Sequence, residues 1–253
     1  MIDHVAVVVP AHNEEAEILG CLTALVAAVE AASPLSSVQI IAVADRCADG
    51  TADLIERFAA RHPVVTPMTV PFGNVGRARD AGAQAALDAI AAVDADEAVL
   101  ERTWLVFTDA DTRVPENWIT AHLDHAGQGA DCVVGTVEPR ADVGNDDLIE
   151  AWFAAHHLGE GHDHVFGANL GIRGSHFVRI GGCPPLRLGE DVAMVHAVTA
   201  VGGTIRRTDD CRVVTSARML GRCHGGFSTY LRELADETDG RLGDIDAEKS
   251  HAG

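Results

Sequence analysis

Short runs of β-branched residues alternate along the chain with segments whose apolar residues recur at helical spacing. The first run, residues 5–9, is continuous and ends at Pro10, as is typical of a strand that is covered on both faces of a parallel sheet. A helix is predicted directly after it, because Asn13 can cap its N-terminus and acidic residues favour its positive end. The apolar stripe of this helix consists of Ile18, Leu22, Leu25, Val26 and Val29.

The same alternation continues through the first half of the chain. Strands that alternate with helices imply right-handed crossovers and a parallel sheet whose ligands bind at the carboxyl ends of the strands. The pattern therefore predicts an α/β fold, with a doubly wound, mostly parallel, twisted sheet flanked by helices. The further strands are predicted at residues 38–44, 64–70 and 104–108, and the helices at residues 51–61 and 76–93.

The second half of the chain is less regular. No linker separates it from the first half, so we expect one domain over residues 1–237, followed by a polar tail, residues 238–253, that frays. A strand is predicted at 131–137, an Asp/Gly/His-rich segment occupies 140–165, and helical patterns return at 191–201 and 227–237.

Composition narrows the range of partners. The chain has 38 Asp and Glu against 19 Lys and Arg, a formal net charge of −19, so it would repel nucleic acids and anionic membranes. No stretch approaches the roughly 18 consecutive apolar residues of a membrane span, and the N-terminus lacks a signal-peptide pattern. We expect a soluble cytoplasmic protein and leave a homodimer open. Without a C-x-x-C spacing, six cysteines are expected to be free thiols: Cys21, Cys47, Cys132, Cys183, Cys211 and Cys223.

Two Asp-Ala-Asp tripeptides differ in their position. Asp94 and Asp96 lie beyond a predicted helix and are interpreted as a solvated turn, whereas Asp109 and Asp111 directly follow the strand at 104–108. Two carboxylates one residue apart in a turn can both reach a hard divalent cation, and Mg²⁺ or Mn²⁺ held there would bridge to substrate phosphates. A solvated turn is the alternative for the second tripeptide as well.

Residues 73–82 form a Gly-containing loop that opens a helix with Arg77 and Arg79 in its first turn. Cations there oppose the helix dipole, at a cost of about 0.3–1 kcal/mol per charge, so a diphosphate is one candidate for the missing anion. The alternative is that an arginine pairs with Asp80 or Asp45. No GxGxxG dinucleotide motif follows the first strand.

Several other polar residues have both a chemical and a structural interpretation. Asp45 could accept hydrogen bonds from a base or ribose, whereas Asp49 and Gly50 are explained as a turn. Asp191 can be a general base or a helix cap. Arg218, Arg222 and His224 concentrate positive charge and a candidate ligand, and pairing with acidic residues is their alternative role. A cluster of histidines and acidic residues has three interpretations: a metal site, although its spacing matches no zinc motif, an acceptor-binding loop, or a polar surface loop. Its members are His156, His157, Glu160, His162, Asp163 and His164.

Taken in chain order, these segments resemble the family-2 glycosyltransferases of the GT-A (nucleotide-diphospho-sugar transferase) superfamily, over roughly residues 4–225. The resemblance implies a single GT-A domain with a Rossmann-like sheet. The matching pieces are Val8 to Glu15 (VVPAHNEE), Ala44-Asp45, Gly76 to Gly82, Phe107 to Asp111 (FTDAD), Gly167 to Arg173 (GANLGIR) and Gly189-Glu190-Asp191.

The resemblance also implies roles for individual residues. Asp111 would hold the metal, with Asp109 and His224 as further ligands. Asp191 would accept the proton of the acceptor hydroxyl, with Glu190 beside it. The residues that would border the acceptor are Gly167, Ala168 and Asn169. Those that would bind the nucleotide are Pro10, Ala11, Asn13, Glu14, Asp45, Gly76, Arg79, Asp109, Arg218 and Arg222.

Such an enzyme would use Mg²⁺ or Mn²⁺ to transfer a sugar, with inversion, from a nucleoside-diphosphate donor to a hydroxyl of a small or soluble acceptor, with UDP as the default nucleotide. Residues 44–47 (ADRC) depart from the adjacent Asp residues and Gly-Ser that the family often has, and the Q-x-x-R-W motif of processive synthases is missing.

Three rival functions are weighed against this one. A sugar nucleotidyltransferase would require a Gly-rich loop with Arg where this chain has residues 10–15. A retaining GT-A enzyme, like those that glucosylate phosphoglycerate, would share the fold and the Asp-Ala-Asp turn and would differ in the anomer of its product. A non-catalytic sugar-nucleotide or metal-binding module would use Glu190 and Asp191 only to cap a helix.

Overall fold

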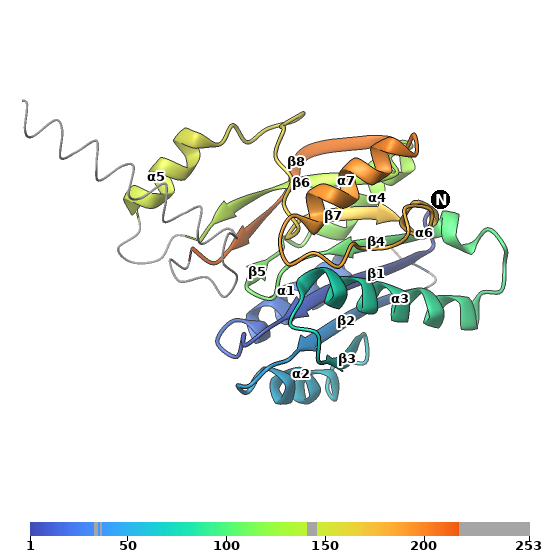
Figure 1. The fold of residues 1–253 in the computed structure, drawn as a ribbon, viewed down its shortest axis with the longest axis horizontal. Helices are drawn as coiled ribbons and strands as arrows, with labels where there is room; N and C mark the ends of the chain where they lie inside the picture. Colours follow the sequence, from blue (N-terminus) through green and yellow to red (C-terminus); the bar gives the residue numbers. More distant parts are fainter. Residues whose placement is uncertain (33–34, 36, 141–145, 218–253) are drawn as a thin grey trace, which may run out of the picture.

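The computed structural model describes residues 1–32, 35, 37–140 and 146–217. The strands of this part form one sheet in the order β3-β2-β1-β4-β7-β6-β8-β5 (Figure 1). Six of these strands run in one direction, and β7 and β5 run in the other. The strands are β1 (His4–Ala11), β2 (Ser37–Asp45), β3 (Val65–Val70), β4 (Thr103–Phe107), β5 (Thr112–Arg113), β6 (Cys132–Pro139), β7 (Leu170–Arg173) and β8 (Ile205–Thr215).

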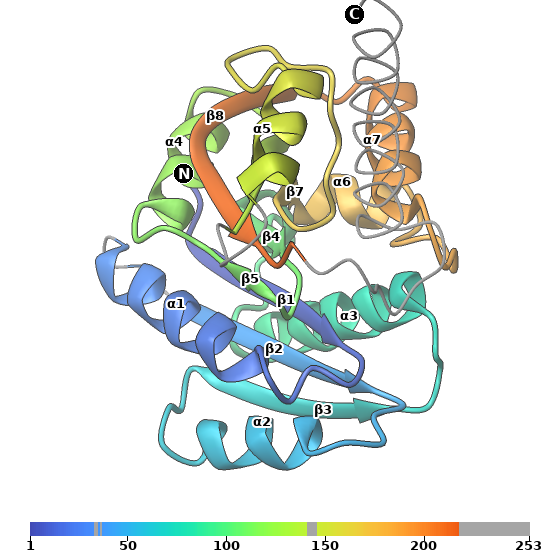
Figure 2. The ribbon, with the colours of Figure 1, turned by 90° about the vertical axis from the view of Figure 1, so that its left-hand side faces the viewer.

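Helices cover both faces of the sheet, and Figure 2 shows α1 and α3 on opposite sides of β1. One face carries α1 (Ile18–Ala31), α2 (Thr51–Ala59) and α4 (Trp118–Gly127). The other face carries α3 (Val75–Val93), α6 (Gly174–Arg179) and α7 (Glu190–Ala200). Two further helical segments are η1 (Val99–Arg102) and α5 (Asp146–Ala155). This arrangement confirms the predicted doubly wound α/β fold.

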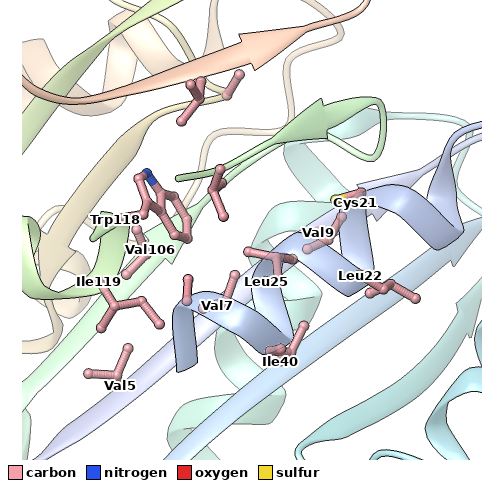
Figure 3. Packing of buried hydrophobic residues seen from close by; sticks show 14 of the residues in the cluster. Val5, Val7, Val9, Cys21, Leu22, Leu25, Ile40, Val106, Trp118 and Ile119 are labelled. Carbon is pink, nitrogen blue, oxygen red and sulfur yellow. The ribbon is translucent and has the colours of Figure 1, made fainter. Parts of the chain in front are cut away.

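β1 is buried on both sides because alternate residues face different helix layers. Val5, Val7 and Val9 pack with α1 and α4 (Figure 3), whereas Ala6 and Val8 belong to the core on the α3 side. All five side chains are fully buried. A continuous run of small and β-branched apolar residues is therefore needed here, since a polar residue at any of these positions would enter one of the two cores.

In the regular part of the chain the structure confirms the elements that the hydrophobic pattern predicts, but Asn13 does not cap α1, which begins at Ile18 with Glu17 at its N-cap. The predicted helix at 227–237 and the predicted tail at 238–253 lie outside the described residues. The strands predicted at 5–9, 38–44, 64–70, 104–108 and 131–137 correspond to β1, β2, β3, β4 and β6, and the helices predicted at 51–61, 76–93 and 191–201 correspond to α2, α3 and α7.

β8 is a long strand that the hydrophobic pattern does not predict. Its sequence, IRRTDDCRVVT, places charged residues among the apolar ones. Arg212 bridges Asp209 and Glu138 with N···O distances of 2.5 and 3.1 Å, while Cys211 and Val213 are fully buried. Because the charges interrupt the apolar alternation, pairing with β6 decides that this segment is a strand.

No helix in the described part of the chain is long and apolar enough to cross a membrane. Cys223 lies outside this part. The remaining cysteines are free thiols, as expected: Cys21, Cys47, Cys132, Cys183 and Cys211. Most of them lie in the cores, where burial raises the pKa of the thiols of Cys183 and Cys211 to about 12.

A buried amide joins the irregular second half of the fold. Asn169 is fully buried, and its Nδ2 donates to the carbonyl oxygens of Thr136 and Cys211, at 2.9 Å each. Its Oδ1 accepts a hydrogen bond from Trp118 Nε1 at 2.9 Å. One side chain thus links β6, β8 and α4. Because the amide is used inside the protein, Asn169 does not present its side chain to an acceptor, contrary to what the family resemblance implies.

We expect Asn169→Ala to lower the free energy of unfolding by roughly 3 kcal/mol, because it leaves buried donors and acceptors unpaired and opens a small cavity. Urea unfolding followed by circular dichroism measures the loss. Asn117→Ala is the matched control, since Asn117 Nδ2 donates to Asp210 O at an exposed site and its loss should cost less than about 1 kcal/mol. Equal losses in the two variants would contradict the bridging role of Asn169.

Candidate functional site

The carboxyl ends of β1, β2 and β4 meet at one edge of the sheet. β1 pairs in parallel with β2 on one side and with β4 on the other, so Ala11, Asp45 and Phe107 end neighbouring strands. The crossover from β1 to β2 uses α1 on one face, whereas α3, on the other face, precedes β4. Ligands of open α/β sheets bind at such a switch in the connections.

The loop that follows β1 is fastened to the loop that follows β2. Asn13 adopts a left-handed conformation, with φ of 56°, and its Oδ1 accepts a hydrogen bond from Ala48 N at 2.7 Å. The backbone N–H of Glu14 donates to Thr51 Oγ1 at 2.7 Å. Four of the expected nucleotide-binding residues lie at this junction: Pro10, Ala11, Asn13 and Glu14.

Asp45 holds the loop that leads into α3. Its side chain is buried, and its two oxygens accept hydrogen bonds from the backbone N–H groups of Gly73 and Asn74, at 2.8 Å each. Asn74 in turn caps α3 by accepting from Arg77 N at 2.9 Å. This carboxylate, a candidate for a base or ribose from the sequence, therefore orients the helix that carries Arg79.

Gly76 lies against the segment that precedes α7. Its N–H donates to Leu186 O at 3.2 Å, and a Cβ at this position would lie 2.1 Å from Pro184 O. A side chain would force these two segments apart, so glycine is required for the contact. Gly76 thereby joins the first turn of α3 to the chain that leads to Glu190 and Asp191.

Arg79 lies at the centre of the candidate site. Its side chain is only 2% exposed, its Nη2 donates to Asp109 Oδ1 at 2.5 Å, and its Nη1 donates to Glu190 Oε1. The guanidinium therefore bridges Asp109 and Glu190 in place of the partners considered from the sequence, Asp80 and Asp45. The Asp80 carboxylate accepts a hydrogen bond from the backbone of the α6–α7 loop. Arg79 connects α3, the end of β4 and the start of α7.

Gly167 makes room for this guanidinium. A Cβ on Gly167 would lie 2.7 Å from both terminal nitrogens of Arg79. The neighbouring residues Ala168 and Asn169 are buried in the interior. Of the three residues expected to border the acceptor, Gly167 is the one that reaches the charged centre of the site.

Burial of these charges shifts their protonation. Loss of hydration raises the pKa of Asp109 to about 6; Arg79 opposes this rise, and the negative charges of Asp111, Glu190 and Asp191 add to it. Burial likewise raises the pKa of Glu190, again with Arg79 opposing. The Asp109 side chain is still 41% exposed, so this carboxylate remains accessible to a ligand.

Asp111 lies in the turn between β4 and β5 and is partly exposed. Thr215 Oγ1, at the end of β8, donates to Asp111 Oδ1 at 3.3 Å. Asp111 and Asp109 together offer the carboxylate oxygens that Mg²⁺ and Mn²⁺ prefer, so these two residues fit a divalent cation. Within the described ranges, no group of three His, Cys, Asp or Glu side chains could hold a metal. The expected residues Arg218, Arg222 and His224 lie outside those ranges.

Glu190 and Asp191 begin α7 but differ in exposure. Glu190 is buried against Arg79, whereas Asp191 is partly exposed and accepts a hydrogen bond from Val192 N at 2.8 Å. The sequence offers little signal for the first contact, because Arg79 and Glu190 are 111 positions apart. The two acidic residues therefore have separate roles: Glu190 anchors the helix, and Asp191 is the carboxylate accessible from outside.

The histidine-rich segment forms a stack of rings. The His156 ring stacks on Trp152 with 3.5 Å between centroids, His164 lies 4.8 Å from His156, and Phe166 lies 5.7 Å from His164. Burial lowers the pKa of His156 and of His162, which favours neutral imidazoles. The rings of His156, His164 and Phe166 therefore pack together beside Trp152, and the metal site, the acceptor-binding loop and the polar surface loop all stay predictions for this segment.

We subtract the free energy of unfolding of the wild type from that of Asp109→Asn. This difference is expected to rise as the pH increases from about 4 to about 6. The unfolded carboxyl titrates near 3.8 and the folded one at about 6. The native state therefore binds more protons in this interval, and the contribution of Asp109 to stability falls as the pH rises. Asparagine does not titrate. Urea unfolding without divalent cations measures the difference at each pH, and a difference that stays constant would contradict the raised pKa.

Comparison with protein families agrees with this arrangement. The family described as "Glycosyl transferase family 2" matches residues 6–177, more than half of the chain. The matched span includes most of β1, all of β2, Arg79, the turn from Asp109 to Asp111, and Gly167. No curated protein matches the sequence at a significant level.

Solved structures share the fold. TarS from S. aureus in complex with UDP-GlcNAc has a TM-score of 0.65 and 15% identity, over 94% of this chain and 66% of that chain. GalNAc-T7 with UDP, GalNAc and Mn²⁺ has a TM-score of 0.63 and 15% identity, over 86% of this chain and 44% of that chain. The mannosyltransferase PcManGT from Pyrobaculum calidifontis with GDP-Man and Mn²⁺ has a TM-score of 0.56 and 20% identity, over 86% of this chain and 58% of that chain. These identities show the fold alone, and the chain spans 66% or less of each relative. From the family match, the chain belongs to glycosyl transferase family 2.

Proposed function

We propose that this protein transfers a sugar from a nucleoside-diphosphate sugar to a hydroxyl group of a small or soluble acceptor. The observation that carries the proposal is the Arg79 bridge, a buried cation between Asp109 and Glu190 at the carboxyl edge of the sheet. The bridge neutralises part of a dense acidic cluster, while Asp111 and Asp191 stay accessible nearby. Membership of the glycosyltransferase family supports the same class of reaction.

The donor would lie across the junction of the loops that follow β1 and β2. Its base and ribose would contact Pro10, Ala11, Asn13 and Glu14, and Asp109 would hydrogen-bond the ribose or water on the metal. Arg218 and Arg222 are the proposed further contacts of the diphosphate. UDP remains the default nucleotide; among the similar structures, TarS is described with UDP-GlcNAc and PcManGT with GDP-Man.

A divalent cation would be held by Asp111, with Asp109 and His224 as further candidate ligands. When bound, it would neutralise the negative charge that develops on the leaving diphosphate. GalNAc-T7 and PcManGT are described with Mn²⁺. The carboxylate oxygens of this turn suit Mg²⁺ equally.

Residues of the chain itself would direct the attack on the donor. Asp191 would accept the proton of the acceptor hydroxyl while the hydroxyl oxygen forms a bond to the anomeric carbon. The bond from that carbon to the diphosphate oxygen breaks, and the nucleoside diphosphate leaves with the electron pair. Attack in line with the breaking bond inverts the configuration. Glu190, through Arg79, keeps α7 and its Asp191 in place relative to Asp109.

The donor site is tested by thermal unfolding. We expect UDP, GDP or dTDP at ~100 times its Kd to raise the midpoint by roughly 5–10 °C with Mn²⁺ or Mg²⁺, because binding adds about 2.7 kcal/mol. EDTA should remove the shift, and so should Asp111→Ala. Asp88→Ala, an exposed aspartate on α3, is the matched control and should keep it. Well-folded protein that shows no shift with any nucleotide would argue against the donor site.

The role of Asp191 is tested by its amide variant. We expect Asp191→Asn to keep the nucleotide-induced thermal shift and to lose turnover by about 100-fold or more, because the acceptor hydroxyl loses its base. Asp124→Asn, at an exposed position on α4, is the control. Full turnover in Asp191→Asn would disprove the base assignment. NMR of the first-formed product should show the inverted anomer; a retained anomer would replace this mechanism with the retaining one and leave sugar transfer itself intact.

A further inference from the structure

Exposed apolar side chains gather beside Asp191. Three large apolar residues with substantial exposure fall within seven positions: Leu186 at 43%, Leu188 at 53% and Val192 at 38%. We call these three residues the apolar lip. Across the remaining described residues, the large exposed apolar side chains are scattered singly along the chain: Met1, Leu19, Val93, Phe153 and Val178. Grouped exposure of this kind marks a binding surface more often than single exposed residues do.

The backbone beneath the lip is firmly attached. Asn74 Nδ2 donates to Pro185 O at 3.1 Å, and Gly76 N donates to Leu186 O at 3.2 Å. In Figure 1 the orange segment that leads into α7 runs along the first turns of α3. The backbone N–H of Cys183 also donates to Asp80 at 2.9 Å. Because these hydrogen bonds fix the backbone, the exposure of the two leucines does not result from a weakly attached loop.

The lip lies where an acceptor would have to approach. Val192 directly follows Asp191 in the first turn of α7, and Leu188 precedes it by three positions. Glu190, between them, is buried against Arg79, which fixes this turn on the body of the protein. A molecule whose hydroxyl reaches Asp191 therefore approaches the turn that carries the lip. This step rests on the proposed function.

We propose that the acceptor is an alcohol that carries an apolar group, such as an alkyl or aryl chain, and that this group binds the apolar lip. Burying a leucine side chain against a ligand stabilises a complex, so the lip would select such acceptors over fully polar ones. A free amphipathic molecule fits better than an anionic bilayer. The protein carries a net charge of −19, and one cation, Arg187, lies between the two leucines in place of a basic cluster.

The test compares two glycosides that differ only in their aglycone. Calorimetric titration of the 253-residue chain with octyl and methyl β-D-glucopyranoside, below the concentration at which the octyl compound forms micelles, measures both affinities. We expect the octyl compound to bind at least about tenfold more tightly. The double variant L186S/L188S should lose this preference. The matched control is Val93→Ser, an exposed apolar residue at the far end of α3, which should keep it.

Each contrary outcome would overturn the proposal. Equal affinity for the two glycosides would mean that the lip is covered by another part of the chain or serves no ligand. A preference that survives in L186S/L188S would place the apolar contact elsewhere. A concentration-dependent dimer that L186S/L188S dissociates, or binding to phosphatidylcholine vesicles but not to the monomeric glycoside, would identify a different occupant. Sugar transfer to the methyl glycoside and hydrolysis of the donor, measured in parallel, report on the proposed function independently of the lip.

Discussion

The buried guanidinium of Arg79 is the interaction on which the candidate site depends. It is the point at which α3, the end of β4 and the start of α7 meet, and each element contributes one charged group to the bridge. Removing one partner of such a buried ion pair leaves an uncompensated charge and typically costs about 3–5 kcal/mol. The surrounding chain is adapted to this group: Asp45 orients the loop before α3, Gly76 lets the α7 segment approach, and Gly167 leaves space for the terminal nitrogens.

A second buried polar group organises the other half of the sheet. Asn169 satisfies carbonyl groups of β6 and β8 and the indole N–H of Trp118, and a Cβ on Gly135 would lie only 2.2 Å from its amide nitrogen. Buried amides of this kind are stable only when their hydrogen bonds are made, so the network specifies one arrangement of these elements. Since β8 ends at Thr215, whose hydroxyl donates to Asp111, the network also helps to position this candidate metal ligand.

The acidic residues of the site divide into structural and accessible groups. Asp45 and Glu190 are buried and satisfied by backbone amides or by Arg79, whereas Asp111 and Asp191 remain partly exposed. Asp109 belongs to both groups, because it binds Arg79 and keeps an accessible surface. This division explains how so many carboxylates can converge: the buried ones are compensated, and the accessible ones are those proposed to bind a cation and the donor and to accept a proton. The apolar lip borders the accessible side.

The sequence by itself determined the α/β class, the strands of the parallel half and the edge of the sheet at which the candidate site lies. These follow from local patterns, since continuous apolar runs such as residues 5–9 form strands buried on both faces, and a carboxylate pair directly after a strand lies at its carboxyl end. Motif order also identified the family. Only the tertiary structure decided the partners of Arg79, the interior position of Asn169 and the existence of β8 as a strand. The physical reason is that these features depend on groups far apart in the sequence, whose charges and hydrogen bonds are satisfied only when the chain has folded.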